Sequence, residues 1–163
     1  MSESFFKELD IPNPHINLNA GGGSQAEQTS KIMIGYESLL EKSPSDYCMV
    51  VGDVTSTLAC AIVAKKAKMK LIHVEAGIRS WDITMPEEIN RIVTDSLTDY
   101  FFTTSEIANK NLLKLGIESS RVFFVGNTMI DTLLAYKNKF KKPRIWERIG
   151  LKNQSFIIMT IHR

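Results

Sequence analysis

Cysteine is scarce in this sequence, because Cys48 and Cys60 are the only two in 163 residues. Both lie inside apolar segments, "YCMVV" and "LACAIV", and their spacing is not that of a metal-binding motif. An isolated free cysteine in apolar surroundings behaves as a small hydrophobic residue. The sequence therefore predicts reduced core cysteines, no metal site and a cytoplasmic location, where thiols stay reduced.

Long hydrophobic runs, a signal peptide and a dominant charge are also missing. The apolar runs are far too short to span a bilayer, and the start, "MSESFFKELD", lacks the basic residues and apolar stretch of a secretory signal. The formal net charge is only +2, with acidic and basic residues interspersed. We therefore expect no membrane partner and no nucleic-acid partner.

Two common phosphate-binding motifs are absent. Neither GxGxxG nor GxxxxGK[ST] occurs, so neither a dinucleotide fingerprint nor a P-loop is supported. The glycine-rich stretch "GGGS" (21–24) follows no predicted strand, and a flexible connection is its simplest interpretation. Any anionic ligand must therefore be held by groups that the fold brings together.

What the sequence does contain is an alternation of strand-like and helix-like segments. The predicted strands are apolar on both faces and cover 46–53, 70–76, 100–105 and 121–126. The predicted helices cover 25–43, 56–68, 86–97, 106–116 and 127–140. Apolar strands that alternate with helices indicate a parallel sheet with helices on both faces. We therefore predict an α/β, Rossmann-like fold.

The two ends of the chain depart from this alternation. A short helix is predicted at 2–9, but no strand precedes 46, so we predict that residues 1–138 form a Rossmann-like domain without its first strand. The basic, proline-containing stretch 139–154 is interpreted as a linker. The apolar segment 155–163 is interpreted as the first strand of a truncated second domain, since a parallel strand normally continues into a return crossover.

Polar residues follow the predicted strands at the point where each strand ends. They are Asp53, Glu75, the turn 103–105, the turn 126–128 and His162. In open parallel sheets, ligands bind at the carboxyl ends of the strands, because loops and helix N-termini converge there. We therefore expect these groups to share one rim, suited to a substrate with a phosphate and a reacting carbon.

The stretch "LIHVEAGIRSWDITMPEEINR" (71–91) raises the question of what its acids do. Glu75 ends an apolar strand, where an unpaired carboxylate costs several kcal/mol of desolvation. Arg79 or Arg91 could pair with it, which would make Glu75 structural. His73 lies two residues earlier and therefore on the same strand face. For His73 a structural role is favoured over a catalytic one.

The remaining acids have simple structural interpretations as well. Asp53 could be no more than an acid that satisfies backbone N–H groups at a helix start. Glu87 and Glu88 lie in the first helical turn after Pro86, where acids complement the helix dipole. Position alone does not distinguish Glu87 from Glu88.

Several motifs in this order resemble the non-hydrolysing UDP-N-acetylglucosamine 2-epimerases. They are "GDVTSTLA", "HVEAGIRS", "MPEEINR", "TTSE" followed by "NLLKLGI", "VGNTMIDTL" and the terminal "HR". The resemblance is specific over 46–163 and looser before it. It implies a two-domain fold of the glycosyltransferase-B type with the active site between the domains. The family's amino-terminal Gly-Thr-Arg-Pro-Glu loop is missing here.

The same resemblance assigns functional residues. Four residues match the family's catalytic positions: Asp53, Glu75, Glu87 and His162. Three more are expected to bind substrate: Arg79, Asn127 and Arg163. The reaction that it implies is redox-neutral: UDP is eliminated, and is added back after a proton returns to the other face of C2. We therefore expect no cofactor and no catalytic metal.

Other functions stay open at this point. A relative acting on a UDP-diacetamido uronic acid, a non-catalytic nucleotide-sugar-binding half, and a retaining glycosyltransferase all share this architecture. The UDP-sugar is the expected partner, with a homodimer expected for the full-length protein. Because His162 and Arg163 end the chain, we expect this chain alone not to turn over substrate.

Overall fold

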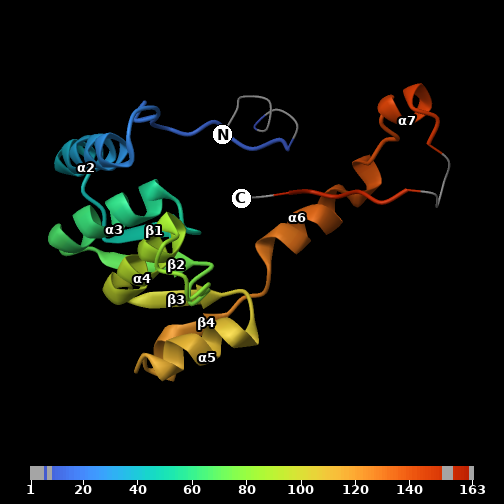
Figure 1. The fold of residues 1–163 in the computed structure, drawn as a ribbon. Coiled ribbons are helices and arrows are strands. Elements are labelled where there is room, and N and C mark those ends of the chain that lie inside the picture. The colour runs from blue at the N-terminus through green and yellow to red at the C-terminus, as the bar shows by residue number, and fades with distance from the viewer. Residues whose placement is uncertain (1–5, 7–8, 152–155, 162–163) are drawn as a thin grey trace. The chain divides into compact units, whose positions relative to one another are not determined.

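The computed structural model describes residues 6, 9–151 and 156–161. Four parallel strands form one sheet in the order β1-β2-β3-β4 (Figure 1). Their bounds are β1 (Tyr47–Val51), β2 (Lys70–Val74), β3 (Tyr100–Thr103) and β4 (Val122–Phe124). The predicted α/β fold with a parallel sheet is therefore confirmed.

Helices alternate with these strands close to where the sequence predicts them. They are α2 (Gln25–Lys42), α3 (Thr55–Lys66), α4 (Pro86–Leu97), α5 (Glu106–Lys114) and α6 (Thr128–Tyr136), with a further short helix α7 (Ile145–Arg148). Short 3-10 turns cover Ser119–Arg121 and Lys137–Lys139. Among the described helices, none combines the length and apolarity needed to cross a bilayer.

Local sequence signals set where the main helices begin. Ser24 and Glu27 form a capping box at the start of α2, in which each side chain accepts the other residue's backbone N–H. Pro86 opens α4, a position where its missing N–H costs nothing. Ser105 caps α5 by accepting a hydrogen bond from the Ala108 amide. α5 therefore begins directly after β3, at the carboxyl end of that strand.

The core lies between the sheet and one layer of helices. Cys48, Val50 and Leu71 pack with residues of α3, while Phe101 packs with Leu112 of α5. Cys48 of β1 pairs with Leu71 of β2, so their side chains point to the same face of the sheet. The chain moves across the sheet one strand at a time, and right-handed crossovers then place every connecting helix on one side.

The opposite face of the sheet is apolar and largely open. Tyr47, Met49 and Val51 of β1 are 55–58% exposed. The neighbouring strands continue this face with half-buried or exposed side chains: Ile72, Val74, Tyr100, Phe102 and Phe123. The second layer of helices that the sequence predicts for this face is not found among the described residues of 1–127.

The chain divides into two compact units, Met1–Asn127 and Thr128–Arg163. The division falls earlier than the predicted domain end at 138. The second unit holds α6 and α7, and α7 lies in the stretch predicted to be a linker. Residues 156–161 form no strand in the structure, contrary to prediction. A strand needs a hydrogen-bonded neighbour, and no described strand pairs with this segment. The predicted amino-terminal helix falls mainly on residues outside those described.

Candidate active site

Asp53 and Glu75 follow neighbouring strands at the same edge of the sheet. Val51 pairs with Val74 in the parallel register, and the Gly52 amide donates to the Val74 carbonyl over 3.0 Å. The backbone then turns sharply after each of these strands, since Gly52 and Glu75 each have φ of 69°. The predicted placement of the two acids on one rim therefore agrees with the geometry.

Glu75 is unusual because it is a non-glycine residue in the left-handed region. Such a conformation costs on the order of 1–3 kcal/mol and is concentrated at functional sites. Its carboxylate lies beside Gly52, where an added Cβ would be 3.5 Å from Oε2. No described residue forms a hydrogen bond or ion pair with this half-buried carboxylate.

Asp53, in contrast, is held in place from α4. Its Oδ2 accepts hydrogen bonds from Arg91, with Nε at 2.9 Å and a second, shorter contact from the same guanidinium. Its carbonyl accepts a hydrogen bond from Asn90 Nδ2 over 2.7 Å. One carboxylate oxygen, Oδ1, remains without a partner among the described residues. Asp53 therefore offers a fixed carboxylate with one open oxygen.

Glu88 is the structural acid of the "PEE" sequence. It is 1% exposed and accepts hydrogen bonds from the Ser80 and Trp81 amides at 2.9 and 3.1 Å. Arg91 Nη1 donates to it over 2.9 Å, so Arg91 bridges Glu88 and Asp53. Burial alone raises the pKa of Glu88, but hydrogen bonds from Ser80, Arg91 and Trp81 outweigh it and hold that pKa below its ordinary value.

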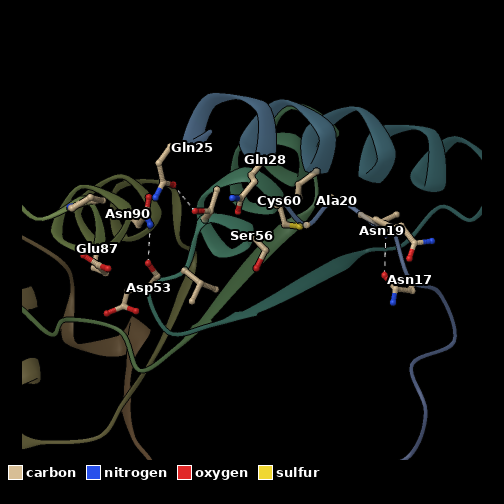
Figure 2. Close-up of a pocket in the computed structure, with 16 residues that line it drawn as sticks. Asn17, Asn19, Ala20, Gln25, Gln28, Asp53, Ser56, Cys60, Glu87 and Asn90 are labelled. Atoms are coloured by element: carbon tan, nitrogen blue, oxygen red, sulfur yellow. Dashed lines mark hydrogen bonds between the residues drawn. The ribbon is translucent and has the colours of Figure 1, made fainter. Parts of the chain in front are cut away.

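Glu87 lies on a different side of the same helical turn and lines a cavity of about 720 Å³ with Asp53. Figure 2 shows Asp53, Glu87 and Asn90 at one end of this cavity and Asn17 and Asn19 at the other, with α2 along one side. No described residue binds the Glu87 carboxylate. Glu75 is not among the lining residues, so the cavity brings together Asp53 and Glu87, while Glu75 lies against Gly52, the residue before Asp53.

The cavity wall is rich in side-chain amides. They are Asn17, Asn19, Gln25, Gln28 and Asn90. Gln25 Oε1 accepts a hydrogen bond from Thr55 Oγ1 over 3.0 Å, which ties the start of α2 to the start of α3. None of the 16 lining residues is a lysine, arginine or histidine. The cavity can therefore bind hydroxyl and acetamido groups but offers no cationic side chain to an anion.

Arg79 and Arg91 have other partners, so the structural alternative in which one of them pairs with Glu75 is not what the structure shows. Arg91 binds Asp53 and Glu88. The side chain of Arg79 is 2% exposed and donates to Asp95 over 2.7 Å. The predicted contact of Arg79 with substrate stays a prediction. In the structure, its guanidinium forms an ion pair with buried Asp95.

The remaining predicted site residues lie further along the chain. Asn127 follows β4, at the carboxyl-end rim. His162 and Arg163 lie outside the described residues. Sequence reasoning missed the tasks of Asn90 and Arg91, although their spacing of three and four residues from Glu87 places them on the same side of α4. Within the described ranges, no group of three or more histidine, cysteine or acidic side chains is placed to hold a metal.

The family model for UDP-N-acetylglucosamine 2-epimerase matches residues 1–163. The chain belongs to this 2-epimerase family. It is 43% identical over 166 residues to the UDP-N-acetylglucosamine 2-epimerase of Methanocaldococcus jannaschii, covering 100% of this chain and 45% of that protein. It is 38% identical over 166 residues to the UDP-2,3-diacetamido-2,3-dideoxy-D-glucuronate 2-epimerase of Pseudomonas aeruginosa, covering 100% of this chain and 46% of that protein.

Solved 2-epimerase structures have the same fold. The M. jannaschii enzyme in complex with UDP-GlcNAc and UDP matches with a TM-score of 0.82 and 46% identity, over 89% of this chain and 40% of that one. The S. aureus MnaA structure with UDP matches with a TM-score of 0.83 and 31% identity, over 91% of this chain and 40% of that one. The chain therefore spans less than half the length of these 2-epimerases.

Proposed function

We propose that this chain supplies the proton-transfer groups of a UDP-N-acetylglucosamine 2-epimerase. The observation that carries the proposal is the convergence of three acids at one sheet edge. Asp53 and Glu87 line one cavity, and Glu75 lies beside Gly52, the residue before Asp53. Family membership and the UDP-GlcNAc bound by the M. jannaschii relative support the same substrate class.

The proposed reaction inverts C2 of the sugar. A base removes the C2 proton as the bond to UDP breaks, which leaves 2-acetamidoglucal, and a proton then returns on the opposite face as UDP adds back. This requires acid/base groups that reach both faces, and each contributes about 10²–10⁴-fold. Glu75 suits such a role because no described residue forms a hydrogen bond or an ion pair with its carboxylate. Asp53 suits it because Arg91 fixes one oxygen and leaves the other open.

The developing charge on the leaving diphosphate needs donors that the cavity does not provide. Its lining contains two carboxylates and no cationic side chain. Stabilisation of a leaving phosphate normally uses cations or oriented N–H groups. We therefore propose that UDP is held by groups outside this cavity, with His162 and Arg163 as the predicted contributors.

The cavity also favours a neutral sugar over a uronate. A uronate carboxylate bound in this cavity would meet amides and the two carboxylates of Asp53 and Glu87, and no cationic side chain. The starts of α3 and α4 reach the cavity, but these same acids stand at those positive ends. An unpaired buried carboxylate is costly. We therefore place UDP-N-acetylglucosamine ahead of the diacetamido uronate used by the P. aeruginosa relative.

The experiment uses the longest natural polypeptide that contains residues 1–163. It is incubated in D₂O with UDP-N-acetylglucosamine, and the products are followed by proton NMR. We expect UDP-N-acetylmannosamine to form with deuterium at C2. The diacetamido uronate is tested in parallel, and a higher kcat/KM for it would overturn the substrate assignment. Epimerisation without C2 exchange would overturn the mechanism. The predicted homodimer is tested by sedimentation of the same sample.

A further inference from the structure

Behind the two acid-bearing turns lies a buried cluster of charged groups that the proposed reaction does not use. His73 is 1% exposed, and its Nδ1 lies 2.7 Å from Asp95 Oδ1. Its Nε2 lies 2.9 Å from the Gly52 carbonyl oxygen. Asp95 Oδ2 accepts hydrogen bonds from the Gly77 amide at 3.1 Å and from Arg79 at 2.7 Å.

The partners of His73 determine its proton count. A carboxylate oxygen and a backbone carbonyl oxygen can only accept hydrogen bonds. A neutral imidazole carries one N–H and one lone pair, so one of these short contacts would set a lone pair against an acceptor. Only the doubly protonated ring donates to both oxygens. We propose that His73 is a buried imidazolium that positions the proton-transfer turns of this site.

The electrostatics of the cluster are consistent with a charged ring. A buried cation needs a paired and hydrogen-bonded anion. Asp95, from α4, is 4% exposed and contacts the ring directly. Arg79, from the segment after β2, is the other charged group in contact with this carboxylate. Both Asp95 oxygens therefore receive charge-assisted hydrogen bonds, which are the stronger kind.

One carboxylate thereby links both turns that carry the proposed acids. Through His73, Asp95 holds the Gly52 carbonyl, and Asp53 is the next residue. Directly, Asp95 holds the Gly77 amide, two residues after Glu75. Neither His73 nor Asp95 is among the residues that line the cavity of Asp53 and Glu87, so we assign them as positioning residues. The inference rests on the proposed function only where it gives Asp53 and Glu75 a role in proton transfer.

The first test counts the ring protons of His73 by NMR and needs no turnover. The ¹⁵N-labelled chain is studied at about pH 8.5, two units above the ordinary histidine pKa of about 6.5. We expect directly bonded protons on both ring nitrogens of His73, because each nitrogen lies against an acceptor oxygen. His15→Gln and His162→Gln identify the signals of the other two histidines in the sequence, which leaves the signal of His73. A single ring proton on His73 at this pH overturns the proposal.

The second test reads the link between the turns. Asp95→Asn should remove one ring proton and speed hydrogen exchange at the Gly52 and Gly77 amides at least tenfold, whereas Glu106→Gln, at an exposed position on α5, should change neither. Unchanged ring protons and exchange in Asp95→Asn overturn the link. If that variant does not fold, the wild-type chain is used instead. The hydrogen-exchange rates of the Gly52 and Gly77 amides should then rise with urea concentration in the same way, because the two turns open together. Different urea dependences also overturn the link.

Discussion

Glu88→Gln should destabilise the protein strongly, although it changes only one atom. The carboxylate accepts three hydrogen bonds of 2.9–3.1 Å and is 1% exposed. Glutamine keeps one acceptor oxygen and turns the other into an NH₂ that faces N–H donors. Removing one partner of a buried ion pair costs about 3–5 kcal/mol, and an unsatisfied buried group about 1–3 kcal/mol. We expect about 3 kcal/mol of lost stability, or roughly 10 °C in Tm.

Glu87→Gln is the matched control, because it makes the same change one residue earlier on α4. No described residue binds Glu87, so we expect its cost to stay within about 0.5 kcal/mol. Urea and thermal unfolding, followed by circular dichroism, give both values. The pKa of Glu88 lies below its ordinary value of 4.5, so its stabilisation is present above pH 4.5 and is lost as the pH falls through the lowered pKa. The gap between wild type and Glu88→Gln should therefore shrink in acid. Equal costs for the two variants would refute this account of the "PEE" sequence.

Three further predictions concern the rest of the first unit. Gly77→Ala should lower the free energy of unfolding by several kcal/mol or prevent folding, because the added Cβ would lie 2.6 Å from a backbone carbonyl of α5. The control is Gly116→Ala, whose Cβ meets nothing within 4 Å and which should cost about 1 kcal/mol; urea unfolding measures both. Burial, and then the neighbouring Cys48, raises the pKa of Cys60 to about 11, so iodoacetamide at about pH 8 should alkylate Cys60 roughly a hundredfold more slowly in the folded chain than in urea. The open sheet face should bind the dye ANS, and Met49→Lys, at a side chain 58% exposed, should lower that fluorescence without lowering stability; equal fluorescence would contradict an open face.

The fold could be predicted from sequence because two independent signals mark its strands. Segments such as 46–53 and 70–76 are apolar on both faces and are separated by helix-length segments with capping residues, and the structure has strands within them. The rim acids Asp53 and Glu75 follow from the same pattern, since parallel strands end at one edge. The final segment shows the limit of this reasoning. An apolar run becomes a strand only where another strand pairs with it, and residues 156–161 have no such pairing in the structure.

Local sequence could not predict which of the acids is buried and which lines the cavity. Glu87 and Glu88 share a first helical turn, and only the return of the loop at Ser80 decides which of them is buried. The arginine partners likewise depend on contacts across the fold. Arg91 reaches back 38 residues to Asp53, a distance in sequence that no spacing rule covers.

The central claim is that Glu75 moves a proton at C2. The most direct measurement compares Glu75→Gln with Glu106→Gln in the longest polypeptide that contains this chain, by following epimerisation of UDP-N-acetylglucosamine and deuterium uptake at C2. We predict at least a ~10²-fold loss of turnover in Glu75→Gln, with wild-type folding, and no change in Glu106→Gln. Near-normal epimerisation and exchange in Glu75→Gln would contradict the account.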